Sequence, residues 1–171
     1  EALLQRDWAN DHLEFNLFAI YGVSGGEDTN NHQRFGTRWQ HFYDPDFYSF
    51  VQAEVSRDEI QEIDERLLLD VGAGYTLWKD SPKELFALEG GIGYRHESFT
   101  SNTTPSRDDA TARAALIYKD IFFDKLEFSE NMEIIFPVTD PQTFIARSTT
   151  GASMPINDAW SLRATLFMEY Q

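Results

Sequence analysis

Apolar and polar residues alternate along most of the chain, and a period of two predicts β-strands. The clearest case is 66–78, where one face carries Leu67, Leu69, Val71, Ala73, Tyr75 and Leu77. The opposite face carries Arg66, Leu68, Asp70, Gly72, Gly74 and Thr76. The stretches 83–99 and 159–171 repeat this design, so a protein built mainly of long strands is expected.

The pattern predicts about nine strands. They lie at 12–22, 32–43, 46–57, 64–79, 83–99, 108–121, 125–137, 142–156 and 159–171. Strands of ordinary globular proteins most often have about 5–6 residues, whereas a tilted strand that spans a membrane needs about 9–11. The lengths therefore favour a tall barrel. A short helix at 59–67 is the one alternative to a strand or loop.

The connections alternate between short and long. Tight turns are predicted at 44–46, 80–82, 123–125 and 157–158, and longer polar loops at 23–31, 57–64, 97–109 and 137–142. In an antiparallel meander every second connection lies at the same end, so the turns gather at one end and the loops at the other. Outer-membrane barrels show this asymmetry. We therefore predict an all-β, up-and-down antiparallel meander that forms a transmembrane β-barrel.

The barrel domain is expected to span 12–171, preceded by an N-terminal segment, 1–11. Bacterial single-chain barrels have even strand numbers. We therefore expect that 1–11 adds a tenth strand, or that strands outside this sequence complete the barrel.

The large aromatic residues lie near the predicted strand ends. We expect aromatic girdles at the two membrane interfaces, built from Trp8, Trp39, Trp78, Trp160, Tyr21 and Tyr94. The alternative is that these rings cap the ends of a soluble core.

The polar strand face carries charges of both signs. The candidates are Arg34, Arg38, Glu54, Arg66, Asp70, Glu89, Arg95, Arg113, Glu127, Glu133, Arg147, Arg163 and Glu169. Lipid does not accept charge at mid-depth, so in a membrane barrel this face must line the lumen. The lumen is then either a selective polar pore or a salt-bridged plug. For a small barrel we favour the plug.

The amino-acid composition argues against several classes of function. The formal charge of −15 argues against a nucleic-acid partner, which requires basic patches. The absence of cysteine excludes disulfides, thiolate metal sites and cysteine catalysis. The mean hydropathy of −0.46 does not argue against a membrane barrel, because the apolar and polar residues that alternate along such strands average to a low value.

Catalytic motifs are weak. His96 and Ser98 share a strand face, but they lie two residues' rise apart, a poor match to the contact of about 3 Å that a serine nucleophile needs with its base. The glycines at 72–74 and 90–93 lack the following helix that a phosphate site requires. The acidic stretch 58–65 lacks EF-hand spacing. We expect no enzyme, no metal and no cofactor.

Two strands carry a family resemblance. Leu67-Leu68-Leu69-Asp70-Val71-Gly72-Ala73-Gly74-Tyr75 is followed, after a Lys/Asp/Ser/Pro turn, by Leu85-Phe86-Ala87-Leu88-Glu89-Gly90-Gly91-Ile92-Gly93-Tyr94-Arg95. This pair, with Arg147-Ser148-Thr149-Thr150 near the C-terminus, resembles the bacterial salt-induced outer-membrane protein (YdiY-like) β-barrel family. The resemblance implies a barrel of about twelve strands, with two strands before and one after those seen here.

Together these observations predict an integral protein of the bacterial outer membrane with a structural, envelope-stress or narrow-pore role. Its expected partners are outer-membrane lipid and the strands or proteins that complete the barrel. Two alternatives stay open: a soluble β-barrel that binds a small apolar ligand, and an outer-membrane enzyme with a site at the loop end.

Overall fold

The chain folds into one antiparallel sheet. The computed structural model describes residues 2–24, 27–59, 62–101, 104–123, 125–140, 143–156 and 160–170, without the side chains of 23–30. The ten strands pair in chain order. They are β1 (Ala2–Asp7), β2 (Asp11–Ser24), β3 (Glu27–Phe42), β4 (Phe47–Asp58), β5 (Ile63–Ser81), β6 (Glu84–Phe99), β7 (Arg107–Phe122), β8 (Leu126–Pro137), β9 (Ile145–Pro155) and β10 (Ser161–Tyr170). The predicted all-β meander is confirmed.

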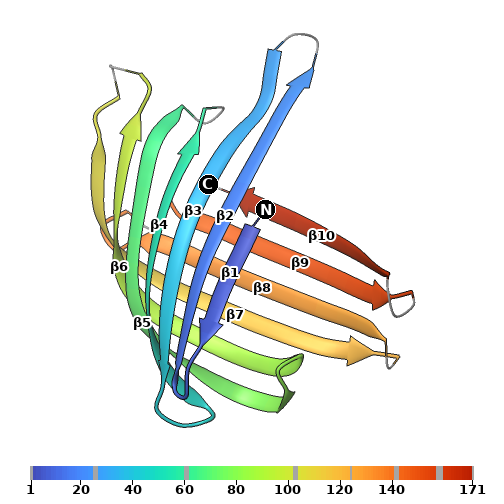
Figure 1. The fold of residues 1–171 in the computed structure, drawn as a ribbon. Helices are drawn as coiled ribbons and strands as arrows, with labels where there is room; N and C mark the ends of the chain where they lie inside the picture. Colours follow the sequence, from blue (N-terminus) through green and yellow to red (C-terminus); the bar gives the residue numbers. More distant parts are fainter. Residues whose placement is uncertain are drawn as a thin grey trace.

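The sheet curls into an open half-barrel (Figure 1). In that view β1–β5 stand in front and β7–β10 cross behind them at a steep angle, so the sheet encloses a concave face. Within the described chain, β1 pairs only with β2 and β10 only with β9. Both outer strands therefore carry an open edge.

The tenth strand comes from the N-terminal segment. Residues Ala2–Asp7 pair with Leu17–His12, because each free backbone donor and acceptor of β2 gains a partner there. The short helix considered as an alternative at 59–67 does not form: β5 begins at Ile63, directly after Glu62, which has a positive φ of 59°.

The predicted polar loop 23–31 is also wrong for most of its length. The β2–β3 ladder continues through Tyr21↔Asn31 and Gly22↔Asn30, then passes an irregularity to Val23↔Asp28 and Ser24↔Glu27. Strand pairing uses backbone groups and does not require an apolar face. The result is a long hairpin that extends beyond the neighbouring strands (Figure 1).

Tight turns occupy one end of the sheet. At 43–46 the Asp44 carboxylate accepts hydrogen bonds from the backbone N–H groups of Asp46 and Phe47, at 2.8 and 2.7 Å. This is the local bonding by which aspartate favours turns. The β5–β6 turn consists of Pro82 and Lys83. The turns predicted at 123–125 and 157–158 include Asp124, Asn157 and Asp158, which lie outside the described residues.

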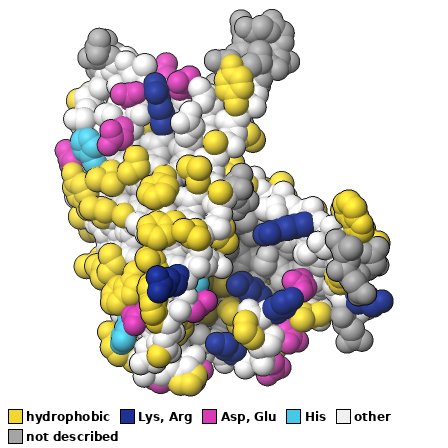
Figure 2. Space-filling view, in the orientation of Figure 1, with side chains coloured by type: hydrophobic (Ala, Val, Ile, Leu, Met, Phe, Trp, Pro, Cys, Tyr) yellow, Lys and Arg dark blue, Asp and Glu magenta, His cyan; other side chains and the backbone are white. Residues whose placement is uncertain are grey.

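The two faces of the sheet have inverted polarity relative to a water-soluble protein. Leu69 on the convex face is 41% exposed, whereas its neighbour Asp70 on the concave face is 4% exposed. The same alternation runs along β5, where Arg66, Leu68, Asp70, Gly74 and Thr76 are buried. Figure 2 shows hydrophobic side chains gathered on the convex face of the front strands, where Phe35, Val51, Val55, Val71 and Tyr75 are exposed.

The concave face is packed tightly where strands carry glycine. The Phe50 ring, 0% exposed, lies against Gly72. A Cβ added at Gly72 would lie 2.5 Å from Cζ of Phe50 and 2.9 Å from Cα of Gly91. Only a residue without a side chain fits at this point, so the glycine serves close packing rather than ligand binding.

Candidate functional site

The concave face holds a set of ion pairs, and Glu89 on β6 is one of its centres. Its side chain is 0% exposed. The carboxylate accepts hydrogen bonds from Arg113 of β7 at 2.8 Å, from the Tyr48 hydroxyl of β4 at 2.7 Å, and from Arg38 of β3. Three donors from three strands thus replace the water that this buried carboxylate has lost.

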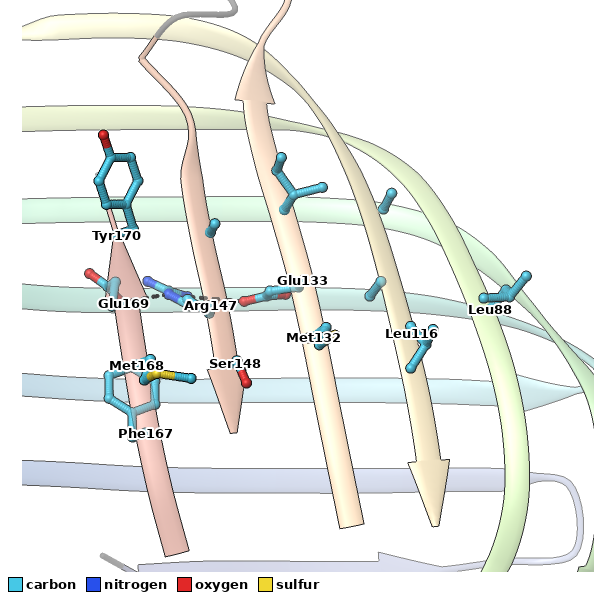
Figure 3. A pocket seen from close by; sticks show the side chains of 14 residues that line it. Leu88, Leu116, Met132, Glu133, Arg147, Ser148, Phe167, Met168, Glu169 and Tyr170 are labelled. Carbon is cyan, nitrogen blue, oxygen red and sulfur yellow. Dashed lines mark hydrogen bonds and ion pairs between the residues drawn. The ribbon is translucent and has the colours of Figure 1, made fainter. Parts of the chain in front are cut away.

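Arg147 on β9 is the second centre. Its guanidinium donates to Glu54 at 2.8 and 3.0 Å, to Glu133 at 3.2 Å and to Glu169 at 2.7 Å. Figure 3 shows Arg147 between Glu133 of β8 and Glu169 of β10. Glu54 belongs to β4, which is not a neighbour of β9 in the sheet. The Arg147–Glu54 pair therefore crosses the interior and ties the front strands to the back strands.

The ion pairs continue toward the loop end. Glu169 lies 3.6 Å from Arg66, and Arg66 donates to Glu97 at 2.6 Å. Arg95 is 3.8 Å from Glu97 and donates to Asp109 at 2.7 Å. Arg107 is 2.8 Å from Asp109 and 3.4 Å from Asp140.

We call this connected set the interior ion-pair network. Its cations are Arg34, Arg38, Arg66, Arg95, Arg107, Arg113 and Arg147, and its anions are Glu54, Glu89, Glu97, Glu133, Glu169, Asp109 and Asp140. Seven arginines face seven carboxylates, so the network is neutral although the chain carries −15. Signs alternate along it, which offsets the desolvation of each member.

Most of the predicted charged face belongs to this network: Arg34, Arg38, Glu54, Arg66, Glu89, Arg95, Arg113, Glu133, Arg147 and Glu169. The other three predicted members lie apart from it. Asp70 is buried and accepts from Gln52 at 3.1 Å. Glu127 pairs with Lys83 at the exposed turn end. Arg163 is exposed and makes no ion pair with the described residues.

Sequence reasoning missed four members of the network. Glu97, Arg107, Asp109 and Asp140 fell within or beside segments predicted as loops. β7 begins at Arg107, and every second residue of a strand lies on the same face. Arg107 and Asp109 precede Arg113 by an even number of residues, so all three share one face. Extending the period of two by these few residues would have found both.

The predicted girdle residues all lie at the surface. Trp8, Trp39, Trp78, Trp160, Tyr21 and Tyr94 are exposed. Trp39 belongs to a row of rings near the tight turns, where its ring centroid is 6.0 Å from that of His41, which in turn is 4.8 Å from that of Tyr43.

A shallow depression of about 950 Å³ lies over β6–β10. On the convex face it is lined by Leu88, Leu116, Met132, Ile134, Met168 and Tyr170, and it also reaches Arg147 and Glu169 (Figure 3). The convex lining is mostly apolar, and its polar side chains are Ser148, whose hydroxyl donates to Glu130 at 2.6 Å, and Tyr170.

In the described ranges, no group of three or more His, Asp or Glu side chains is arranged to hold a metal ion. No helix long and apolar enough to cross a membrane occurs in that part of the chain.

The fold defines a class, an antiparallel meander with an ion-paired concave face and an apolar convex face. Comparison with known families assigns the chain further. Residues 1–171 match the family described as "Protein of unknown function, DUF481", and the chain belongs to this family. No curated protein and no solved structure matches the chain.

Proposed function

We propose that this chain is an integral β-barrel protein of the bacterial outer membrane, with a structural role in the envelope and an interior closed by charge pairing. The observation that carries this proposal is the inverted polarity of the sheet. Large apolar side chains such as Leu69, Val71 and Tyr75 are exposed on the convex face, while arginines and carboxylates are buried on the concave face.

Lipid gives this arrangement a physical reason. In water, the exposed apolar face would lose the free energy that its burial provides, about 25 cal/mol per Å². Against hydrocarbon the same face is stable, and charged side chains must then turn inward. A soluble barrel for an apolar ligand needs the opposite arrangement, an apolar lining with charges outside. The concave face here is lined instead by Arg113, Glu89 and their partners.

The interior favours a structural role over a pore. A wide aqueous channel is typical of barrels with about 16 or more strands, whereas side chains fill smaller ones. Arg147 reaches across the interior to Glu54, so the space between the front and back strands is occupied.

The open edges also bear on the proposal. Backbone groups at a sheet edge find no partner in hydrocarbon, so a membrane barrel has to be closed. We propose that the free edges of β1 and β10 are covered in the membrane by further strands or by a protein partner. Exposed Leu162, Leu166 and Met168 on β10 would then join a continuous lipid-facing surface.

The strands β5 and β6 support a more specific assignment. Their Gly-x-Gly-Tyr pair, Gly72-Ala73-Gly74-Tyr75 and Gly91-Ile92-Gly93-Tyr94, resembles the salt-induced outer-membrane (YdiY-like) proteins. We propose a role in the envelope response to osmotic or salt stress on this basis.

Fractionation tests the membrane proposal. The expressed protein should sediment with outer membranes, resist washing with alkaline carbonate, and enter solution only with detergent. Release by carbonate without detergent would contradict the proposal.

A further inference from the structure

A group of polar side chains lies on the convex face at the loop end, outside the interior ion-pair network. His96 of β6 and Asp108 of β7 are register partners, and the distance between His96 Nδ1 and Asp108 Oδ1 is 2.8 Å. The Tyr94 hydroxyl donates to the same oxygen of Asp108. The carboxylate therefore fixes the imidazole through Nδ1, while Nε2 makes no hydrogen bond to another described residue and can act as a base.

Ser98 supplies a hydroxyl on the same face. It lies two residues after His96 on β6, about 6.8 Å along the strand between Cα atoms. The two side chains share one strand face, so the Ser98 side chain has to lean along the strand toward His96 to bring Oγ to Nε2. Among the described residues, the Ser98 hydroxyl makes a single long contact of 3.5 Å, with the backbone oxygen of Glu65. Breaking this contact frees the hydroxyl to turn toward His96.

The other histidines show why this group stands out. His12, His32 and His41 also lie within 4.0 Å of a carboxylate, from Asp7, Asp58 and Asp11 respectively. None of them has a serine two positions away on its own strand, and His96 does. His41 has Ser49 as its register partner on β4, but the Ser49 hydroxyl lies 3.2 Å from the Tyr43 hydroxyl. A carboxylate, an imidazole and a hydroxyl in this order are the parts of a serine hydrolase site.

We propose that Ser98, His96 and Asp108 form a hydrolytic site for the carboxylic esters of membrane lipids. The substrate class rests on the proposed membrane function. Loops of outer-membrane barrels face outward, so the site would lie near the outer boundary of the bilayer, where lipid ester bonds are found. Leu67 and Leu69 are the β5 partners of His96 and Tyr94, and they would contact the acyl chain.

The reaction balances without a cofactor. Ser98 Oγ attacks the ester carbonyl while His96 Nε2 takes the hydroxyl proton. The C–O bond to the alcohol breaks, and His96 gives that proton to the departing alkoxide oxygen, which leaves an acyl-Ser98 ester. Water, deprotonated by His96, then attacks this ester, the acyl C–Oγ bond breaks, and His96 returns the proton to Ser98 Oγ as the fatty acid leaves. Asp108 acts as a positioning residue, because it contacts His96 and not the substrate.

The first test uses the full chain in detergent micelles, with p-nitrophenyl butyrate as substrate and a fluorophosphonate as covalent probe. The wild type should hydrolyse the ester and take up the probe at Ser98. Ser98→Ala should lose the labelling, and both Ser98→Ala and His96→Asn should lose about 100-fold or more of the rate. Matched controls are Ser148→Ala and His12→Asn, which should keep the wild-type rate. Labelling elsewhere, or an unchanged rate in Ser98→Ala, would overturn the proposal.

The role of Asp108 needs a readout that misfolding does not mimic. Asp108→Asn should lower kcat with little change in KM, and Asp108→Glu should restore part of kcat. Equal kcat in all three proteins would contradict the positioning role.

The second test separates this proposal from the membrane proposal. Vesicles of phosphatidylethanolamine and vesicles containing an acylated saccharide lipid are each incubated with the reconstituted protein, and released fatty acid is measured. Release from either, lost in Ser98→Ala, identifies the lipid class. If the protein hydrolyses the soluble ester but releases no fatty acid from either kind of vesicle, the proposed lipid substrate is overturned and the proposed hydrolytic site stands. Release of the protein by alkaline carbonate without detergent would overturn the membrane proposal, whatever the result of the ester assay.

Discussion

Arg147 and Glu54 lie 93 residues apart in the chain, yet the Arg147 Nη2 atom is 2.8 Å from Oε1 of Glu54. The pair connects β9 to β4 across the concave face rather than along the sheet. Backbone ladders fix only neighbouring strands, so this contact helps to set the curvature that brings the two halves of the sheet together.

Loss of Arg147 should therefore be costly. Arg147→Met leaves three partly buried carboxylates, those of Glu54, Glu133 and Glu169, without their shared cation, and we expect the free energy of unfolding to fall by about 3–5 kcal/mol. Urea unfolding in micelles measures this. Arg163→Met is the matched control, because Arg163 is exposed and has no ion pair among the described residues. Equal losses for both variants would argue that the network is not stabilising.

Coupling between the partners can be isolated. In a double-mutant cycle, Arg147→Met and Glu54→Gln together should cost less than the sum of the single changes, with an interaction energy of about 0.5–3 kcal/mol. Strict additivity would indicate that the 2.8 Å contact between these residues contributes nothing.

Two glycines on neighbouring strands should respond in opposite ways. Gly72→Ala would place a Cβ 2.5 Å from Cζ of Phe50 and should destabilise the protein by about 1–3 kcal/mol. Gly90→Ala meets nothing within 4 Å and should be close to neutral. Thermal unfolding in micelles compares them, and a tolerated Gly72→Ala would contradict the tight packing under Phe50.

The paired interior should conduct ions poorly. The network alternates in sign and includes no ring of a single charge of the kind that selects ions. Recording from the full chain in planar bilayers should show little or no current, and Arg113→Ala or Arg95→Ala should raise it by opening space beside Glu89 and Asp109. A large, steady, ohmic current in the wild type would support a pore instead.

Neighbouring residues of β5 should differ in their tolerance of charge. Leu69→Arg places a cation on the convex face, where an arginine at the bilayer midplane costs about 2–4 kcal/mol. Asp70→Asn keeps an oxygen that can accept from Gln52. The folded fraction after insertion into liposomes should therefore fall more for Leu69→Arg. Similar folded fractions would remove support for lipid contact at Leu69.

The sequence was most informative where one strand face is continuous. Along 67–77 the apolar residues at odd positions face outward and the residues between them face the concave side, as predicted, because strand geometry fixes a period of two. The extended β2–β3 hairpin could not be predicted in this way, since its polar residues pair through the backbone. The distant partners Glu54 and Arg147 could not be predicted either. Alternation tells which face a charge occupies, but not which strands the curvature of the sheet brings face to face.

Spin labels placed along β5 would test the membrane account most directly. The chain has no native cysteine, so single cysteines at 67 through 76 can each be labelled alone. In reconstituted liposomes, labels at Leu67, Leu69, Val71, Ala73 and Tyr75 should collide strongly with oxygen, which concentrates in lipid. Labels at the intervening positions should collide with it weakly. A period of two with maxima at the odd positions is the predicted result. High accessibility of the odd positions to a water-soluble nickel chelate would contradict it.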